Sequence, residues 1–170
     1  MLRLHMIWPG LLAVAFGVSA AEPVPEIQRK PGAPQAVGIL HTLRTIPEAC
    51  ARLQGQFTGL AASPYKFAAV RTSERCQPRA RLVDAATAKA SAANGWILND
   101  VIRVPAAECP ARQAVVRVWR KDAKAQPPKL DAQGRSRIYL KDGLDAARDG
   151  DLGPIPSYAA VLQVEGKGCR

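Results

Sequence analysis

The chain has 170 residues and a formal net charge of +10, with 24 lysine and arginine side chains against 14 aspartate and glutamate side chains. This length fits one domain with a real core and leaves no room for two large ones. Only 5% of the residues are aromatic, and no basic stripe is interleaved with them as base stacking requires, so nucleic acid is not an expected partner.

Residues 1–20 have the three parts of a secretory signal peptide. Arg3 lies in a short basic start, residues 6–18 are apolar, and small residues close the segment. The apolar part has about 13 residues, whereas a membrane-spanning helix needs about 20, which disfavours an uncleaved anchor. We therefore expect cleavage after Ala20 or Ala21, export to the periplasm or the medium, and no transmembrane segment in the mature chain.

The next segment, residues 21–36, is rich in proline and lacks an apolar period. Such composition is typical of an extended, flexible lead. We expect a single disulfide-bonded domain over residues 37–170. Loss of Arg3 with the signal leaves this mature chain with a net charge of +9.

Short runs rich in Val, Ile and aromatic residues, bounded by turn-forming residues, recur along this domain and predict strands. The predicted strands are residues 37–44, 65–72, 79–85, 96–104, 113–120, 137–141 and 158–164. In residues 113–120 the apolar side chains alternate cleanly. In residues 96–104 four apolar side chains share one face, which Asp100 interrupts: Trp96, Leu98, Ile102 and Val104.

One helix is predicted after the first strand. Thr45 can cap it, Pro47 suits its first turn, and Glu48 favours its positive N-terminal end. An apolar series follows at a spacing close to four: Ala49, Leu53 and Phe57. A shorter helical turn is predicted over residues 143–148. The expected fold is α+β and β-dominated, with a mostly antiparallel sheet of about six to seven strands, one clear helix and two disulfides.

The disulfides are predicted from an even number of cysteines in an exported chain: Cys50, Cys76, Cys109 and Cys169. Four cysteines permit three pairings, of which Cys50–Cys76 with Cys109–Cys169 is favoured because the first pair is closest in sequence. Tracing strand directions places the bridges at one end of the domain, with the last strand parallel to the sixth. No C-x-x-C occurs and His41 is the only histidine of the mature chain, so neither a metal nor a redox or other cofactor is expected.

Three pieces of the sequence carry a family resemblance: TIPEACARLQGQFTG, PYKFAAVRTSERCQPRARLVDA and GWILNDVIRVP. They resemble stretches of small uncharacterised secreted bacterial proteins, over roughly residues 37–120. The resemblance agrees with export and implies no function.

Catalytic schemes find little support in the sequence. His41 lies in a predicted strand with no nucleophile motif, which favours a structural role. Among the acids Glu48, Glu74, Asp84, Asp100 and Glu108, Asp100 is the candidate for a buried catalytic carboxylate; the alternative is a bulge or pairing with an arginine such as Arg103 or Arg117. Acids in the turn-rich segment 142–153 lack the EF-hand ligand pattern and predict a solvated loop: Asp145, Asp149 and Asp151.

The candidate binding surface is an arginine cluster around the second and third predicted strands: Arg71, Arg75, Arg79 and Arg81. Guanidinium groups suit phosphate and carboxylate ligands, although a solvated hairpin with local ion pairs is the alternative. We expect a non-catalytic exported binding or envelope-associated protein whose partner is an anionic envelope polymer or an acidic protein. The alternatives are an inhibitor of a secreted enzyme and a small hydrolase that uses carboxylates alone.

Overall fold

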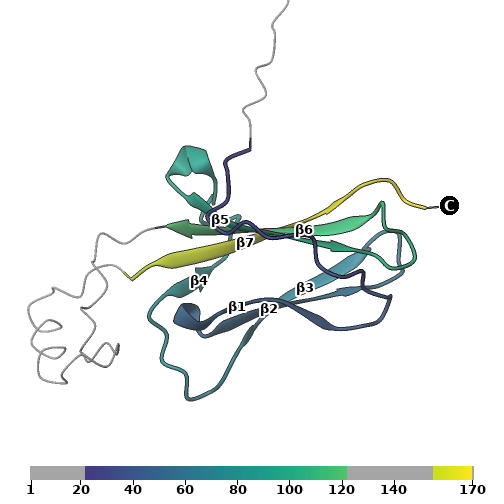
Figure 1. Cartoon of the computed structure of the whole chain (residues 1–170). Coiled ribbons are helices and arrows are strands. Elements are labelled where there is room, and N and C mark those ends of the chain that lie inside the picture. The colour runs from purple at the N-terminus through teal and green to yellow at the C-terminus, as the bar shows by residue number, and fades with distance from the viewer. Residues whose placement is uncertain (1–21, 122–154, 170) are drawn as a thin grey trace, which may run out of the picture.

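The computed structural model describes residues 22–121 and 155–169, which form a sandwich of two β-sheets (Figure 1). The described residues contain seven strands: β1 (His41–Ile46), β2 (Ala51–Phe57), β3 (Tyr65–Arg71), β4 (Arg81–Val83), β5 (Ile97–Pro105), β6 (Gln113–Lys121) and β7 (Ser157–Glu165). Two short 3₁₀ helices accompany them, η1 (Pro47–Ala49) and η2 (Ala92–Asn94). The β-dominated architecture is confirmed, but the seven strands form two sheets where one was predicted.

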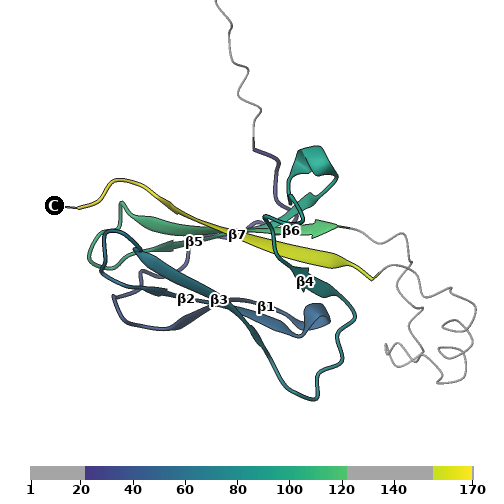
Figure 2. The ribbon, with the colours of Figure 1, turned by 180° about the vertical axis from the view of Figure 1, so that it is seen from behind.

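The first sheet has the order β1-β2-β3 and the second β4-β7-β6-β5. All neighbours are antiparallel except β4 and β7, which pair in parallel. Both views show the two layers stacked face to face (Figures 1 and 2). The edge strands are therefore β1 and β3 in one layer and β4 and β5 in the other.

The inner faces of both sheets supply one core. Leu53 and Phe57 from β2 lie in the same buried cluster as Ile102 from β5 and Val116 and Val118 from β6. Strand alternation produces this layer directly, since every second residue of β2 and β6 points inward. Burial of these side chains is the main force that holds the sheets together.

The predicted helix is wrong, because the segment after Pro47 is a single 3₁₀ turn followed by β2. Leu53 and Phe57 are four residues apart, a spacing that fits a helix and equally fits alternate positions of a strand. Burial alternates along the whole of β2, which identifies the period as two. Cys50, with φ of 51° in the left-handed region, turns the chain from η1 into the strand.

A bulge in β5 changes the predicted face of that strand. Its pairing with β6 shifts register between Leu98 and Asp100, so Asn99 is the extra residue. Leu98 consequently joins Trp96 in a second cluster on the outer face, while Ile102 lies in the core between the sheets. The four apolar residues expected on one face are thus divided between two.

Residues 22–37, called the strap below, lie along the outer edge of β5, which differs from the flexible lead that their composition predicts. The amide of Ile27 donates to the carbonyl of Asn99 at 2.8 Å, and that of Gly32 to Arg103 at 2.7 Å. At its end the strap reaches the other sheet, where Val37 forms a bridge to Phe57. Prolines are compatible with this pairing because an edge segment needs few of its amides as donors.

The disulfides are Cys50–Cys76 and Cys109–Cys169, the pairing that the sequence favours. Their predicted location at one end is wrong. The start of β7 pairs with β4 beside η1, and its end pairs with Gln113 beside the β5–β6 loop. Because β7 runs antiparallel to β6, the two bridges lie at opposite ends of the sandwich, as the positions of η1 and the C-terminus show (Figure 2).

Besides β5, five of the predicted strands are present. The strand predicted at residues 37–44 corresponds to β1 with shifted ends, and β4 is much shorter than the strand predicted at residues 79–85. The predicted signal peptide, the strand predicted at residues 137–141 and the helical turn predicted at residues 143–148 lie outside the described residues. No helix among the described residues is long and apolar enough to span a membrane.

Candidate binding site at the seam between the two sheets

The two open sides of the sandwich differ. On the side of β1 and β5, the strap covers the edge of β5 and Asp100 of β5 pairs with Arg44 of β1. On the side of β3 and β4, no described segment pairs with either strand edge along the groove between them. We call this groove the seam.

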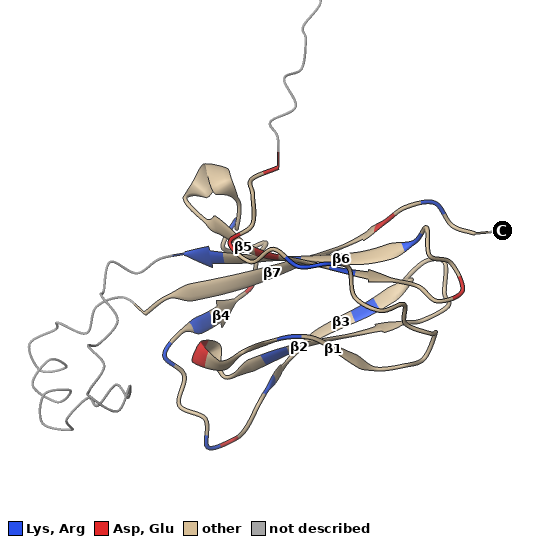
Figure 3. Ribbon diagram, viewed as in Figure 1, with Lys and Arg blue, Asp and Glu red and all other residues tan. Residues whose placement is uncertain are grey.

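The loop over residues 72–80 joins β3 to β4 at one end of the seam and, with the adjoining strand ends, carries the predicted arginines. Figure 3 shows basic positions spaced along the loop, and the acidic residue between them is Glu74. Arg71 ends β3, Arg75 and Arg79 belong to the loop, and Arg81 begins β4. The tertiary structure thus places all four on one connection between the sheets.

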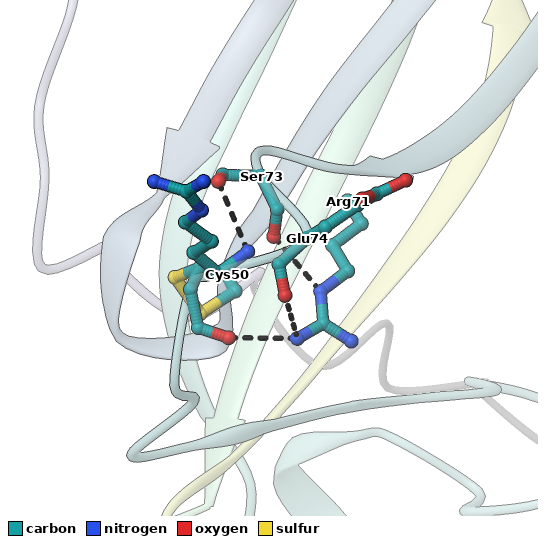
Figure 4. The surroundings of a disulfide bond; sticks show 6 residues. Cys50, Arg71, Ser73 and Glu74 are labelled. Carbon is teal, nitrogen blue, oxygen red and sulfur yellow. Dashed lines mark hydrogen bonds between the residues drawn. A yellow bond between two sulfur atoms is a disulfide. The ribbon is translucent and has the colours of Figure 1, made fainter.

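Arg71 organises this loop. Its guanidinium donates to the carbonyl oxygens of Ser73 at 2.9 Å, Glu74 at 3.2 Å and Cys76 at 2.7 Å (Figure 4). The Cys50–Cys76 disulfide ties the same loop to the start of β2. Arg71 therefore shapes the site, because its Nε and Nη2 donors are already used within the loop.

Arg75 and Arg81 have a different status. Both are exposed, and neither guanidinium makes a hydrogen bond or ion pair with any residue in the described ranges. Arg79 is also exposed, and its backbone amide donates to the carbonyl of Glu48 at 2.7 Å. The structure thus separates one positioning arginine, Arg71, from two that are available to a ligand.

The seam itself is hollow. One hollow of about 420 Å³ lies at the end bearing Arg71 and Arg81, and a second of about 280 Å³ adjoins it. The two share part of their lining: Ala69, Leu82 and Val83. Alanines at positions 49, 51, 69 and 80 leave this space because they carry only a methyl group. The floor is therefore apolar and the rim carries positive charge.

Backbone polar groups also face the seam from β3. The pairs Thr58–Pro64 and Thr72–Cys50 are hydrogen-bonded across β2 and β3, so the even-numbered residues of β3 bond to β2. The odd-numbered residues must direct their N–H and C=O groups away from β2. Phe67, Ala69 and Arg71 thus present a row of main-chain donors and acceptors to the seam.

Asp84 is an acidic residue in the lining of the second hollow. The backbone amide of Thr87, at 2.7 Å from its carboxylate, lowers the pKa of Asp84 and keeps it ionised. The seam is consequently polarised along its length, with arginines at one end and a carboxylate at the other.

Asp100, the candidate for a catalytic carboxylate, is fully buried and already paired. Its oxygens accept hydrogen bonds from Arg29 of the strap at 2.9 Å and from Arg44 at 3.1 Å. The alternative expected for Asp100, a bulge or pairing with an arginine, therefore describes its environment. Its partners are Arg29 and Arg44, however, and not Arg103 or Arg117. Arg29 escaped prediction because nothing in the sequence indicates that the strap docks on β5.

His41 has a structural environment. Its Nε2 lies 2.7 Å from the hydroxyl of Tyr65, and its ring contacts those of Phe57 and Tyr65. Burial raises the pKa of Tyr65, so this hydroxyl stays protonated. No serine or cysteine nucleophile contacts His41 among the described residues.

Two arginines of β6 form ion pairs with the strap. Arg117 binds Glu22, and Arg120 binds Glu26 at 2.6 Å. The hydrogen bonds from these guanidinium groups lower the pKa of both glutamates. The basic charge of Arg117 and Arg120 on β6 is thus matched by acids of the same chain.

Within residues 22–121 and 155–169, no group of three or more His, Cys, Asp or Glu side chains is arranged to hold a metal ion. Asp145, Asp149 and Asp151 lie outside these ranges. Comparison of the chain with protein-family models, with curated proteins and with solved structures found no match in any of the three.

Proposed function

We propose that this is an exported, non-catalytic binding protein that holds an anionic partner at the arginine-bearing end of the seam. The observation that carries the proposal is the availability of Arg75 and Arg81, which are exposed and unpaired among the described residues, with Arg81 also lining an apolar hollow. The planar guanidinium group binds carboxylates and phosphates in a two-pronged geometry. The partner class is therefore an anionic envelope polymer or an acidic protein.

Export is supported by the two disulfides, which persist in oxidising compartments. The mature chain has a net charge of +9, which draws anionic partners from a distance. Periplasmic residence and release to the medium are both compatible with this function.

The test is charge reversal on the intact mature protein, with binding to poly-L-glutamate and to an acidic polysaccharide as the measurement. R75E/R81E should abolish binding, and affinity of the unaltered protein should fall steeply with salt because exposed charges are screened over ~10 Å at 0.1 M. The matched control K30E/K167E changes net charge equally, at two exposed lysines away from the seam. Equal losses in both variants, or no loss in either, would contradict a defined site.

Inhibition of a secreted protease is a second candidate function, favoured by the constrained loop around Arg75. That loop is held by the Cys50–Cys76 bridge and by three hydrogen bonds from Arg71. A rigid loop with an exposed arginine fits a protease whose specificity pocket carries an aspartate. Stoichiometric inhibition of trypsin that R75A removes would support this function, and slow cleavage after Arg75 without inhibition would exclude it for that protease class.

A hydrolase that works with carboxylates alone gains no support from Asp100. Its side chain is buried and accepts hydrogen bonds from Arg29 and Arg44, which hold it in a structural role. A general acid or base needs access to its substrate within hydrogen-bonding distance.

A further inference from the structure

We infer that the seam binds an extended acidic peptide segment of a partner protein, which adds as a strand to the free edge of β3. The inference rests on the proposed function, since it assigns a partner to the same arginine-bearing site. It goes further because it makes the backbone of β3, and not charge alone, the recognition element.

The edge of β3 is a suitable template. Over its seven residues β3 pairs with β2 without a register shift, so its outer edge is regular. The N–H and C=O groups of Phe67 and Ala69 point into the seam, as the alternation of the β2–β3 ladder requires. An extended peptide satisfies such a row with main-chain hydrogen bonds, which is the mode known as β-augmentation.

The edge lacks most of the features by which sheet proteins block such pairing, although β3 carries one exposed charge within the strand, Lys66. Proteins blunt an exposed edge with proline, a bulge, an inward-pointing charge or a covering segment. β3 contains neither proline nor bulge, and Arg71 at its end is turned to the carbonyls of the 72–80 loop. By contrast, the strap covers β5. Among the described residues, no comparable segment lies along β3.

The opposite wall of the seam provides space and apolar contact. In β4, Arg81 bonds to β7 through its amide, which donates to Pro156 at 2.8 Å, so the backbone of Leu82 faces away from β7. Leu82 and Val83 line both hollows together with Ala69. Every second side chain of an added strand would point into this apolar space, and the others outward.

Charge complementarity identifies the peptide as acidic and orients it. Arg75 and Arg81 stand at the end of β3 that Arg71 closes, and Asp84 lies at the other end. Glutamate or aspartate side chains should therefore lie near the 72–80 loop. Just before β4, the amides of Arg79 and Ala80 donate to the carbonyl of Glu48 in η1, which limits the seam at this end.

The experiment compares three probes on the intact mature protein by titration calorimetry. The first is a peptide of about eight residues that alternates valine and glutamate, a length that matches a typical strand. The second is the same peptide N-methylated at alternate amides, in both possible phases, which keeps its charge and removes its edge donors. The third is an acidic polysaccharide. Strand addition predicts that one N-methylated phase binds at least about tenfold more weakly than the parent, since two or more hydrogen bonds are lost.

A protein variant tests the same edge from the other side. A69P removes an amide that faces the seam and leaves the bonds to β2 in place, and proline is tolerated at such edge positions. A69P should bind the parent peptide more weakly and should bind the polysaccharide as tightly as the unaltered protein does. Its melting temperature is checked first; should A69P fail to fold, the N-methylated peptides on the unaltered protein still decide the matter.

The outcomes separate the two proposals. Loss of peptide binding on N-methylation in one phase, together with loss in R75E/R81E, supports both. Equal binding of the parent and both N-methylated peptides, with loss in R75E/R81E, overturns strand addition and leaves the anionic binding site intact. Binding of none of the three probes overturns both.

Discussion

The hydroxyl of Tyr65 lies 2.7 Å from Nε2 of His41, and the two residues belong to the outer strands of the same sheet. Tyr65 reaches His41 by crossing the central strand at Gly55, where an added Cβ would meet the tyrosine hydroxyl at 1.9 Å. One hydrogen bond thus joins β3 to β1 over a residue that must lack a side chain.

We predict that Gly55→Ala destabilises the protein by about 1–3 kcal/mol, because Tyr65 must leave a well-packed position. Thermal or urea unfolding measures the change. Gly32→Ala is the control, since a Cβ there makes only ordinary contact, at 3.4 Å from the carbonyl oxygen of Arg103. An unchanged melting temperature for Gly55→Ala would show that Tyr65 is not held over this glycine.

Asp100→Ala should destabilise the protein by about 3–5 kcal/mol, because it removes the buried carboxylate that joins the strap, β1 and β5 and leaves the guanidinium of Arg44 without that partner. Arg29→Ala should lower the free energy of unfolding by less. The Arg29 side chain is 36% exposed, and Asp100 keeps Arg44, whose side chain is only 13% exposed, as a partner. Urea unfolding of the two variants gives the order. A wild-type midpoint for Asp100→Ala would refute the structural role and restore Asp100 as a candidate catalytic residue.

The strap should loosen in acid. Hydrogen bonds from Arg117 and Arg120 hold the pKa values of Glu22 and Glu26 below the ordinary 4.5. These contacts therefore stabilise docking fully above the unfolded-state pKa and lose that contribution as the pH falls through the lower folded-state values. Hydrogen exchange at the amide of Ile27, corrected for intrinsic rates, should show protection at neutral pH that declines in this acid range.

Glu26→Gln provides the control for the strap, because the amide cannot titrate. Its strap protection should be weaker at neutral pH and should depend less on pH than that of the unaltered protein. Absence of protection at neutral pH in the unaltered protein would mean that residues 22–37 remain a flexible lead in solution.

The two disulfides should differ in their effect on binding. C50A/C76A releases the 72–80 loop and should weaken binding to poly-L-glutamate, whereas C109A/C169A acts at the other end of β7 and should leave binding intact at a temperature where both variants fold. Each deletion should cost about 2–5 kcal/mol of stability. Equal binding by both variants would show that the arginine loop does not depend on its bridge.

Sequence reasoning located the strands that are long and regular. Residues 65–72, 113–120 and 158–164 agree closely with β3, β6 and β7, because an alternating run has one favourable conformation whatever surrounds it. The disulfide pairing was also predictable from order along the chain. The clustering of arginines in the sequence pointed to the candidate site. It did not show that Arg71 would bond within the loop while Arg75 and Arg81 remain exposed.

The amino-acid sequence by itself determined local properties: strand periodicity, the even cysteine count, the positive charge and the arginine cluster. The tertiary structure alone decided which edges are open. Leu53 and Phe57 fit either a helix or a strand until packing against the second sheet fixed their period, and Arg29 became the partner of Asp100 only when the strap met β5. The seam depends on β3 and β4, neighbours in sequence that belong to different sheets, because non-local pairing assigns each strand to its layer.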